Sequence, residues 1–328
     1  METVPRICCL GFVFLLSCSE SAAVDAAPEP APVKLRRTFA AAVEGGLALL
    51  DVDDGHVVAK APGGVVDDVV VDRARGRLIT FEIEPDEEGG AIVGRPIDSI
   101  NDRTLLGSSA GVLRFAVTDH HVLVFEDAYG PRWRALDGRT SVFAPTPRSA
   151  WARGKRLHAL TWEPDGRWAE RSVSIDGPDL GTIELGSAPP LSSSSPRMVS
   201  VDGRAVALDV ASGKLSLDGV DTGLAAAAVV DACPLSEHAF ALLASGPTRL
   251  VVGALGGPYA SLAIEGQPRF DPRYLSRSIV PVSSSRVLVA VTDRVFAVHV
   301  RNGASPSLSI DEHFAAQGAH APIDGLLP

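Results

Sequence analysis

A chain of 328 residues can form two ordinary domains or one larger closed repeat unit. With 46% hydrophobic and 21% charged residues it can bury a large core, which excludes a protein that is disordered over most of its length. The formal net charge of −10 argues against a nucleic-acid partner, because nucleic acids are bound through clustered basic surfaces.

The first 17 residues have the layout of an export signal. Arg6 precedes an apolar stretch from Ile7 to Leu16, and the small residue Ser17 follows that stretch. About ten apolar residues are too few to cross a bilayer core of roughly 30 Å as a helix. The sequence therefore predicts that residues 1–17 are a cleaved signal peptide and not a membrane anchor.

Leu15, Leu16, Ser17 and Cys18 resemble the lipobox of bacterial lipoproteins, in which the cysteine is lipidated and becomes the mature N-terminus. The resemblance implies a membrane anchor at Cys18 and a lipid-anchored location in the cell envelope. Because Ser19 is not an aspartate, it further implies the outer membrane, at its periplasmic face or at the cell surface. The alternatives are an ordinary secretory signal that contains a cysteine, or a buried strand.

Residues 18–37 are rich in Ala and Pro, with Pro28, Pro30 and Pro32 at alternate positions. Such a segment has nothing to bury, and we expect a flexible, semi-extended tether. Cleavage at the lipobox leaves Cys233 as the only other thiol, in a run of Ala and Val residues. This context favours a buried structural cysteine over a catalytic nucleophile.

Residues 38–328 repeat a unit of an apolar strand, a tight polar turn and a second strand, and Gly or Pro interrupts almost every window that could form a helix. The turns are centred near residues 45, 74, 119, 154, 203, 235 and 284. Their mean spacing of about 40 residues is close to that of β-propeller blades. The sequence predicts an all-β body that is a single propeller of seven blades, although the uneven spacing also allows six or eight.

Two of these units look like copies of each other. The pattern Asp-Val-x-x-Gly occurs at Asp51–Gly55 and again at Asp209–Gly213. It resembles the YVTN-type and pyrroloquinoline-quinone-like propeller repeats of exported bacterial proteins. The resemblance implies the same blade architecture over most of the body.

Composition also predicts where some strands lie within a blade. Arg77–Glu84 nearly alternates between polar and apolar residues, which predicts an outer strand with one wet face. Val122–Phe125 and Val287–Val291 are apolar on both faces, which predicts strands packed between neighbouring blades. Closure of the ring pairs a terminal strand with the opposite terminus, and either Arg36–Val43 or Ser307–Ile310 could supply it.

Two short patterns invite a chemical interpretation. Asp51, Asp53 and Asp54 could share a calcium ion, but no glutamate follows at the distal position, so a solvated hairpin turn is favoured. One Gly-x-Ser-x-Gly match would make Ser109 a hydrolase nucleophile at a strand-to-helix turn. Because Val112–Val117 continues as a strand, a small-residue connection is favoured there.

Aromatic and histidine side chains form the remaining groups. Four tryptophans fall within the third and fourth units: Trp133, Trp151, Trp162 and Trp168. They could form a stacking platform for a sugar or quinone ring, but packing between blades is favoured. Four histidines form two pairs: His120 with His121, and His313 with His320. We expect them to be exposed, since neighbours on a strand point to opposite faces and the C-terminal pair lacks a third ligand.

The sequence predicts no catalytic, cofactor-binding or metal-binding residue, and Cys18 is the only predicted site residue. We therefore expect a non-catalytic binding or scaffold lipoprotein that holds a protein or envelope-polymer partner and needs no cofactor. The alternative is a propeller enzyme of the lactonase, glycosidase or lyase kind, whose catalytic groups come from different blades. A central channel lined by buried charged groups with shifted pKa values would favour the enzyme, and one lined by Val, Ala and Ser would favour the scaffold.

Overall fold

A computed structural model describes residues 37–327, except 84–88, 110, 119, 127–131, 137–140, 144–146, 154, 176–180, 189–190, 192–195, 255, 270–276, 302 and 304. The described residues belong to one unit, Leu35–Pro328. The predicted signal peptide, Cys18 and the tether as far as residue 36 lie outside them. No helix in the described part of the chain is long and apolar enough to span a membrane.

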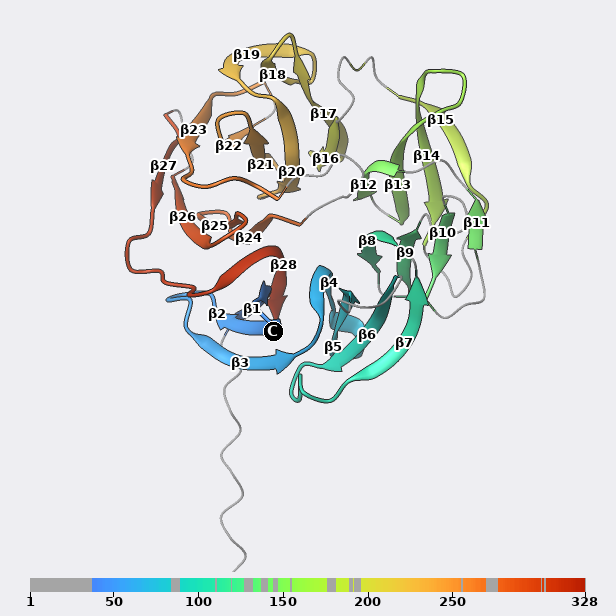
Figure 1. Cartoon of the computed structure of the whole chain (residues 1–328). Helices are drawn as coiled ribbons and strands as arrows, with labels where there is room; N and C mark the ends of the chain where they lie inside the picture. The colour runs from blue at the N-terminus through green and yellow to red at the C-terminus, as the bar shows by residue number, and fades with distance from the viewer. Residues whose placement is uncertain are drawn as a thin grey trace, which may run out of the picture. The chain divides into compact units, whose positions relative to one another are not determined.

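The strands form seven four-stranded sheets that radiate from a common axis (Figure 1). From the inner strand outward, blade 1 has β28 (Ala319–Leu327), β1 (Thr38–Val43), β2 (Gly46–Asp51) and β3 (Val57–Pro62). Blade 2 has β4 (Val65–Asp72), β5 (Arg77–Ile83), β6 (Gly90–Pro96) and β7 (Thr104–Ser109). Blade 3 has β8 (Val112–Val117), β9 (Val122–Glu126), β10 (Arg132–Ala135) and β11 (Ser141–Phe143).

Blades 4 to 7 have the same order of strands. Blade 4 has β12 (Pro147–Arg153), β13 (Arg156–Trp162), β14 (Trp168–Ser174) and β15 (Glu184–Ser187). Blade 5 has β16 (Arg197–Val201), β17 (Arg204–Ala211), β18 (Lys214–Leu217) and β19 (Val220–Ala225). Blade 6 has β20 (Ala228–Pro234), β21 (Ala239–Ser245), β22 (Arg249–Ala254) and β23 (Tyr259–Ala263). Blade 7 has β24 (Ile279–Ser283), β25 (Arg286–Ala290), β26 (Val295–Arg301) and β27 (Ser307–Ile310), and one 3-10 helix, Arg73–Arg75, lies in the β4–β5 turn.

This arrangement confirms the seven-bladed β-propeller. Each of the seven predicted turns lies between consecutive strands of one blade. The apolar clusters lie between neighbouring blades: one of them packs Phe39 and Leu50 of blade 1 against Leu288 and Ala297 of blade 7. Val122–Phe125 in β9 and Val287–Ala290 in β25 are buried, as their sequences predict.

The C-terminal strand closes the ring. β28 pairs with β1, from Thr38 opposite Leu327 to Val43 opposite Ala319, and it takes the innermost place of blade 1. Of the two predicted alternatives, the one containing Thr38–Val43 is therefore confirmed. The other, Ser307–Ile310, is wrong, because that segment is β27 at the outer edge of blade 7.

Closure by β28 also corrects which strands of a blade the predicted turns join. Because β28 supplies the inner strand, the first predicted turn joins the second and third strands of blade 1, whereas the other six join first and second strands. This offset explains the short interval between the first two turns. The similar segments Asp51–Gly55 and Asp209–Gly213 accordingly occupy different places in their blades, after the third strand and after the second.

Gly55 lies where the C-terminal segment crosses blade 1. Its φ is +79°, and a Cβ there would lie 2.7 Å from the backbone nitrogen of Ala316. The Ala315 N–H donates to the Asp54 carbonyl oxygen at 2.9 Å. Only glycine combines this backbone conformation with this close approach.

The prediction that Arg77–Glu84 is an outer strand is wrong. Arg77–Ile83 is β5, the second strand of blade 2, and Glu82 is fully buried. Its carboxylate accepts hydrogen bonds from the buried Arg95 guanidinium, from Nε at 3.1 Å and Nη2 at 3.0 Å. The polar residue Glu82 in this alternating sequence is thus paired with a buried arginine and is not exposed to solvent. The half-exposed strands are outer ones such as β3 and β23.

Candidate functional site

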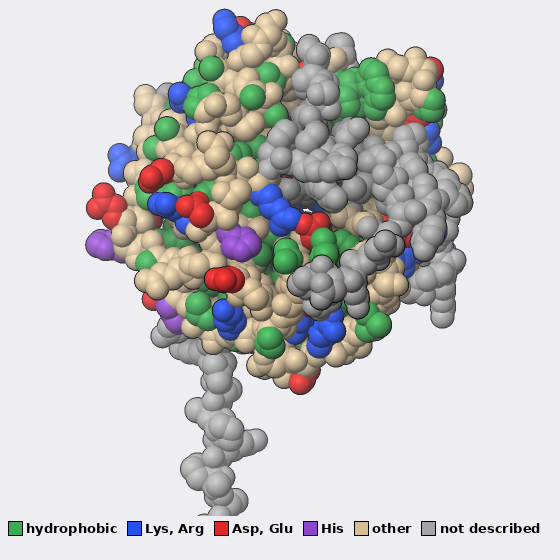
Figure 2. All heavy atoms as spheres, viewed as in Figure 1, with side chains coloured by type: hydrophobic (Ala, Val, Ile, Leu, Met, Phe, Trp, Pro, Cys, Tyr) green, Lys and Arg blue, Asp and Glu red, His purple; other side chains and the backbone are tan. Residues whose placement is uncertain are grey.

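The inner strands line the central channel, and each blade has a polar residue within its inner strand or directly before it. One such residue comes from each blade: Asp324, Asp68, Arg114, Ser149, Arg197, Asp231 and, just before β24, Arg277. Basic and acidic side chains lie side by side near the centre of the ring in Figure 2. The channel therefore contains charged groups and is not lined by small apolar residues alone.

Four of these side chains connect neighbouring blades. Each accepts a hydrogen bond from a backbone N–H on the inner strand of the next blade, or just before that strand: Asp324 from Val71 at 2.8 Å, Asp68 from Phe115 at 2.8 Å, Ser149 from Met198 at 2.9 Å, and Asp231 from Ser278 at 2.8 Å and Ile279 at 3.1 Å. The bonds to the three carboxylates are charge-assisted and therefore stronger than the neutral bond to Ser149. The carboxylates therefore hold the ring together as acceptors.

Arg277 connects blade 7 with three other blades. Its Nη1 donates to Asp324 Oδ1 at 3.2 Å, its Nη2 donates to the Phe115 carbonyl oxygen, and its Nε lies 3.7 Å from Asp68 Oδ1. Burial alone would lower the pKa of Arg277, but Asp324, Asp68 and Asp231 outweigh burial and raise this pKa above its ordinary value. Arg277 is therefore a permanent positive charge inside the ring.

The Asp68 carboxyl group is the strongly shifted acid of this network. Burial raises its pKa from 3.8 to about 6, although Arg277, the Phe115 N–H and Arg114 each lower it. Arg114 shows the opposite effect for a base, since burial and the charge of Arg277 lower its pKa. A charged group buried in this channel therefore destabilises the fold unless a group of opposite charge lies beside it.

The shifted pKa of Asp68 makes stability depend on pH. The folded state binds this proton more tightly than the unfolded state, so the contribution is fully present below about pH 4 and is lost as pH rises through about 6. Between pH 5 and pH 7.5 the free energy of unfolding should fall by about 1.4 kcal/mol from this group. Urea unfolding of wild type and Asp68→Asn at both pH values should show this fall in the wild type only, and equal falls in both proteins would contradict the assignment.

A cavity of about 300 Å³ opens at one end of the channel. Arg73, Arg114 and Arg277 line it together with one carboxylate, Asp324, and the ring of Trp151. Asp68 is not among its lining residues. The described walls thus present cationic donors and one acidic group that is already bonded to Arg277 and Val71.

A larger cavity of about 450 Å³ lies between blades 5 and 6. Its walls are mostly apolar, with Phe240 inside and the exposed side chains of Val220 and Tyr259 at the edge. Its charged pair, Arg204 and Asp218, lies 3.7 Å apart. The channel cavity is the stronger candidate for a specific site, because charged groups from several blades converge there.

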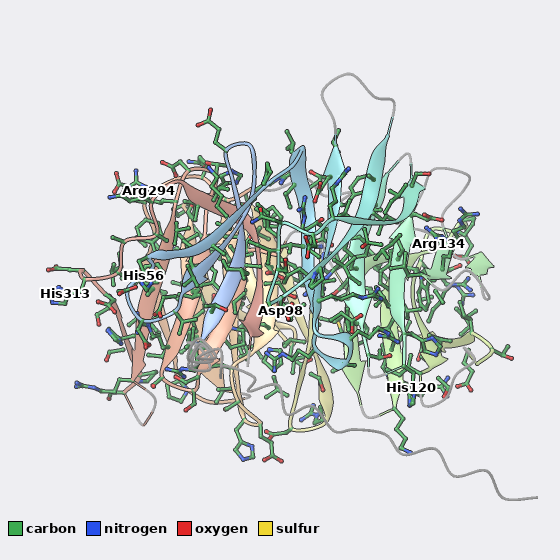
Figure 3. The ribbon with its side chains drawn as sticks, turned by 90° about the horizontal axis from the view of Figure 1, so that it is seen from below. His56, Asp98, His120, Arg134, Arg294 and His313 are labelled. Carbon is green, nitrogen blue, oxygen red and sulfur yellow. The ribbon has the colours of Figure 1, made fainter. Side chains whose placement is uncertain are left out.

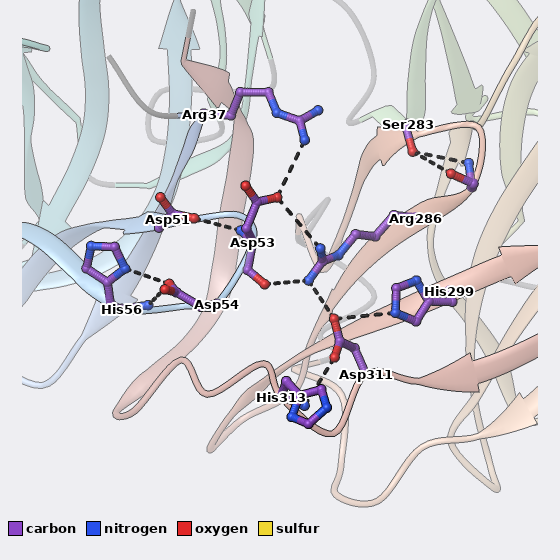
Figure 4. Close-up of polar contacts among 11 residues, drawn as sticks. Arg37, Asp51, Asp53, Asp54, His56, Ser283, Arg286, His299, Asp311 and His313 are labelled. Atoms are coloured by element: carbon purple, nitrogen blue, oxygen red, sulfur yellow. Dashed lines mark hydrogen bonds and ion pairs between the residues drawn. The ribbon is translucent and has the colours of Figure 1, made fainter. Parts of the chain in front are cut away.

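The predicted acidic group lies at the junction of blades 1 and 7 (Figure 4). The hairpin turn is confirmed, with Asp51 buried and Asp53 and Asp54 exposed. Asp53 turns toward Arg286 of blade 7, which donates from Nη2 to the Asp53 carbonyl oxygen at 2.9 Å. Ligand atoms of Asp51, Asp54 and His56 lie within 4.8 Å of one another, so these three residues could hold a metal ion. His56 Nδ1 already lies 2.5 Å from Asp54 Oδ1.

The tryptophans divide into two pairs. Trp133 and Trp151 are buried, which confirms packing for these two. Trp133 packs edge-on against Phe125, with ring centroids 5.3 Å apart. Trp162 is 48% exposed and packs edge-on against Trp168, with centroids 5.0 Å apart across β13 and β14. The packing interpretation therefore does not extend to this surface pair.

The histidines do not converge on one site. His56 and His313 lie at one side of the propeller in Figure 3, and His120 lies toward the other. His120 and His313 are exposed as predicted, but His121 is buried, since β9 begins at the next residue. His320 is half-buried, because the segment predicted as a C-terminal tail is the closing strand.

Ser109 and Cys233 have structural surroundings. Ser109 ends β7, its hydroxyl donates to the Gly111 carbonyl oxygen at 3.1 Å, and β8 follows, so the small-residue connection is confirmed. Cys233 in β20 is half-buried against the apolar cluster between blades 6 and 7. Burial and the neighbouring Asp231 raise the pKa of the Cys233 thiol well above its ordinary value, which disfavours a reactive thiolate.

The channel residues were not predicted from the sequence. One signal could have found them: Asp68, Arg114 and Asp231 each interrupt an apolar run at a similar place in their units. A charged residue within a strand that should be buried on both faces needs a partner from another part of the chain. Comparing the units would have placed these residues together on the axis.

Comparisons with known proteins support the fold. No family model and no curated protein matches the chain. A candidate 6-phosphogluconolactonase from Bacteroides fragilis is 11% identical, with a TM-score of 0.58 over 92% of this chain and 100% of that one. A quinoprotein alcohol dehydrogenase-like protein from Bacteroides thetaiotaomicron is 10% identical, with a TM-score of 0.53 over 89% of this chain and 78% of that one. These similarities show the β-propeller fold alone.

A third solved structure has a similar fold without an assigned role. This functionally unknown protein from Desulfotomaculum acetoxidans is 8% identical, with a TM-score of 0.57 over 88% of this chain and 98% of that one. The propeller neighbours thus carry different descriptions.

Proposed function

We propose that this chain is an exported lipoprotein that acts as a non-catalytic binding module, with its propeller holding a protein or envelope-polymer partner. The resemblance of Leu15–Cys18 to a lipobox supports the anchor and the envelope location, in the outer membrane. Asp51–Gly55 and Asp209–Gly213 support a repeat of the YVTN or pyrroloquinoline-quinone-like type. The membrane is then one partner, through the lipid on Cys18.

The residues that line the channel cavity support the proposed binding role. The described lining residues include three arginines and one carboxylate, Asp324, which accepts from Val71 and Arg277. Guanidinium groups bind anions through several N–H donors, but they do not act as bases or nucleophiles. The arrangement is therefore suited to holding a ligand and not to transforming one.

The lipid anchor makes a direct prediction. Cys18→Ala should remove the protein from the membrane fraction and abolish labelling by a palmitate analogue, because the proposed lipidation site is then missing. Cys233→Ala is the matched control, since it removes the thiol of β20 and should leave both properties unchanged. Membrane association that persists in Cys18→Ala would contradict the anchor.

The channel face makes a second prediction. Arg73 is exposed at the cavity, so Arg73→Glu should reverse a surface charge without disturbing the fold. In intact cells, cross-linking of the full-length protein to its partner should fall about tenfold or more, because like charges at an interface cost several kcal/mol. Arg301→Glu, at an exposed position in β26, should cross-link as the wild type does. Equal cross-linking by both variants would place the partner elsewhere and overturn this assignment.

The channel meets the condition stated for the alternative of a propeller enzyme, because it contains buried charged groups with shifted pKa values. The pKa of Asp68 near 6 lies in the range of a general base, and charged groups from several blades do meet in the channel. Against this, Asp68 accepts hydrogen bonds from Val69 and Phe115 at 2.9 and 2.8 Å. Turnover of a lactone, glycoside or uronide by the purified protein, lost in Asp68→Asn, would replace the binding role by the enzymatic one.

A further inference from the structure

We infer that the channel cavity binds an oxyanion group, a phosphate or a carboxylate carried by the partner, through Arg73, Arg114 and the indole N–H of Trp151. This inference rests on the proposed binding function and names the chemistry of its ligand. It follows from donors on Arg114 and Trp151, two residues that line one cavity and whose side chains have no hydrogen-bond acceptor among the described residues.

Arg114 is the central donor. It projects from β8 with 17% of its side chain exposed, and among the described residues its guanidinium makes no hydrogen bond. Its nearest carboxylate oxygen, on Asp231, lies 4.0 Å from Nη1, which is beyond hydrogen-bond distance. A guanidinium carries five N–H donors, and burial lowers the pKa of Arg114 by disfavouring its charged form. A buried charged donor without an acceptor is costly, and an anion in the cavity would remove that cost.

Trp151 supplies an independent observation. Its side chain is only 7% exposed, it lines the same cavity, and its indole Nε1 has no hydrogen-bond partner in the described part of the chain. The ring is held by stacking on His158, with centroids 5.5 Å apart and planes 17° from parallel. Buried indole N–H groups usually find an acceptor. In the proposed complex, a ligand oxygen at the cavity wall is this acceptor.

Charge and size define the ligand. Arg73, Arg114 and Arg277 outnumber Asp324 on the cavity walls, in a chain whose formal net charge is −10. Arg277 donates hydrogen bonds to Asp324 and Phe115. In the described part of the chain Arg114 has only the 4.0 Å ion pair with Asp231, so its N–H groups and those of the exposed Arg73 are the donors that can bond to a ligand. A volume of about 300 Å³ fits one phosphate- or carboxylate-bearing unit and not a folded segment. The planar fork of arginine suits both groups.

The test titrates the full-length lipidated protein in detergent with inorganic phosphate and with acetate, while sodium chloride holds the ionic strength constant. Binding is measured from the rise in thermal midpoint with anion concentration. At least one anion should stabilise the wild type in a saturable manner. A preference for phosphate would identify a phosphorylated ligand, and a preference for acetate a carboxylated one.

Matched substitutions assign the binding to this cavity. Trp151→Phe keeps an aromatic ring for stacking but removes the N–H, and Arg114→Met removes the guanidinium. Each should weaken anion binding about tenfold or more, because a hydrogen bond to a charged group is lost. Trp133→Phe is the control, since Trp133 is also buried with an indole nitrogen that has no described partner, but it does not line the cavity. It should bind as the wild type does.

The outcomes separate this inference from the proposed function. Saturable binding that is lost in Trp151→Phe and Arg114→Met but kept in Trp133→Phe supports the oxyanion site, whatever the cross-linking of Arg73→Glu shows. No stabilisation by either anion, or equal weakening in all three variants, overturns the site. If the partner still cross-links in an Arg73-dependent manner in that case, the binding function stands and its ligand is not an oxyanion.

Discussion

Removal of residues 319–328 is expected to abolish cooperative folding. The truncation deletes β28, whose Ala319, Ala321 and Ile323 are buried against blades 1 and 7. It also leaves the backbone of β1 unpaired at the channel and removes Asp324, which accepts from Val71 of the next blade. An open inner edge and an exposed apolar cluster should cost more than about 5 kcal/mol, comparable to the whole stability of an ordinary domain.

A circular permutant is the control for this truncation. Leu327 lies opposite Thr38 in the register, so a short hairpin linker can join residue 327 to residue 37 and place β28 before β1. The permutant should unfold in urea with a single transition near that of the wild type, while the truncated protein should show none. A truncated protein with an unchanged midpoint would contradict closure by β28.

Arg277→Met should destabilise the protein by about 3–5 kcal/mol at pH 7.5, because it leaves buried carboxylates without their cation. The substitution breaks the bond to Asp324, the ion pair with Asp68 and the bond to the Phe115 carbonyl oxygen. The loss should shrink at pH 5, where Asp68 takes up a proton and no longer leaves an unpaired charge. Urea unfolding at the two pH values measures both effects.

Arg294→Met is the matched control for this loss. Arg294 contacts Asp293 and Glu265 at 3.2 and 3.5 Å, but 45% of its side chain is exposed. Exposed ion pairs contribute little, so the change should stay within about 1 kcal/mol at either pH. Equal losses for the two variants would show that Arg277 is an ordinary surface cation and not the connection between four blades.

The architecture could be predicted from the sequence because it depends on local patterns. Apolar strands joined by polar turns mark the hairpins, and Gly55 and Gly213 lie in turns where φ is positive. The place of each strand within its blade depends on distant pairing. Only the contact of Thr38–Val43 with Ala319–Leu327 shows that the first hairpin is one strand further out than the others.

The channel could not be predicted in the same way, because its groups meet only when the ring closes. Asp68 looks like one more acid beside Asp67, and Arg114 looks like a charge on a wet strand. Their burial and their partners come from other blades. The same reason explains the misplaced Arg77–Glu84, since alternation cannot distinguish water from the guanidinium of Arg95 as the partner of Glu82.

The most direct test of the oxyanion site in the channel is a crystal structure of the protein grown with tungstate, a heavy oxyanion that replaces phosphate. We expect an anomalous peak in the channel cavity, within hydrogen-bond distance of the Arg114 guanidinium and the Trp151 indole nitrogen. The peak should disappear in Arg114→Met and remain in Trp133→Phe. A cavity without a peak in the wild-type protein would contradict the oxyanion site.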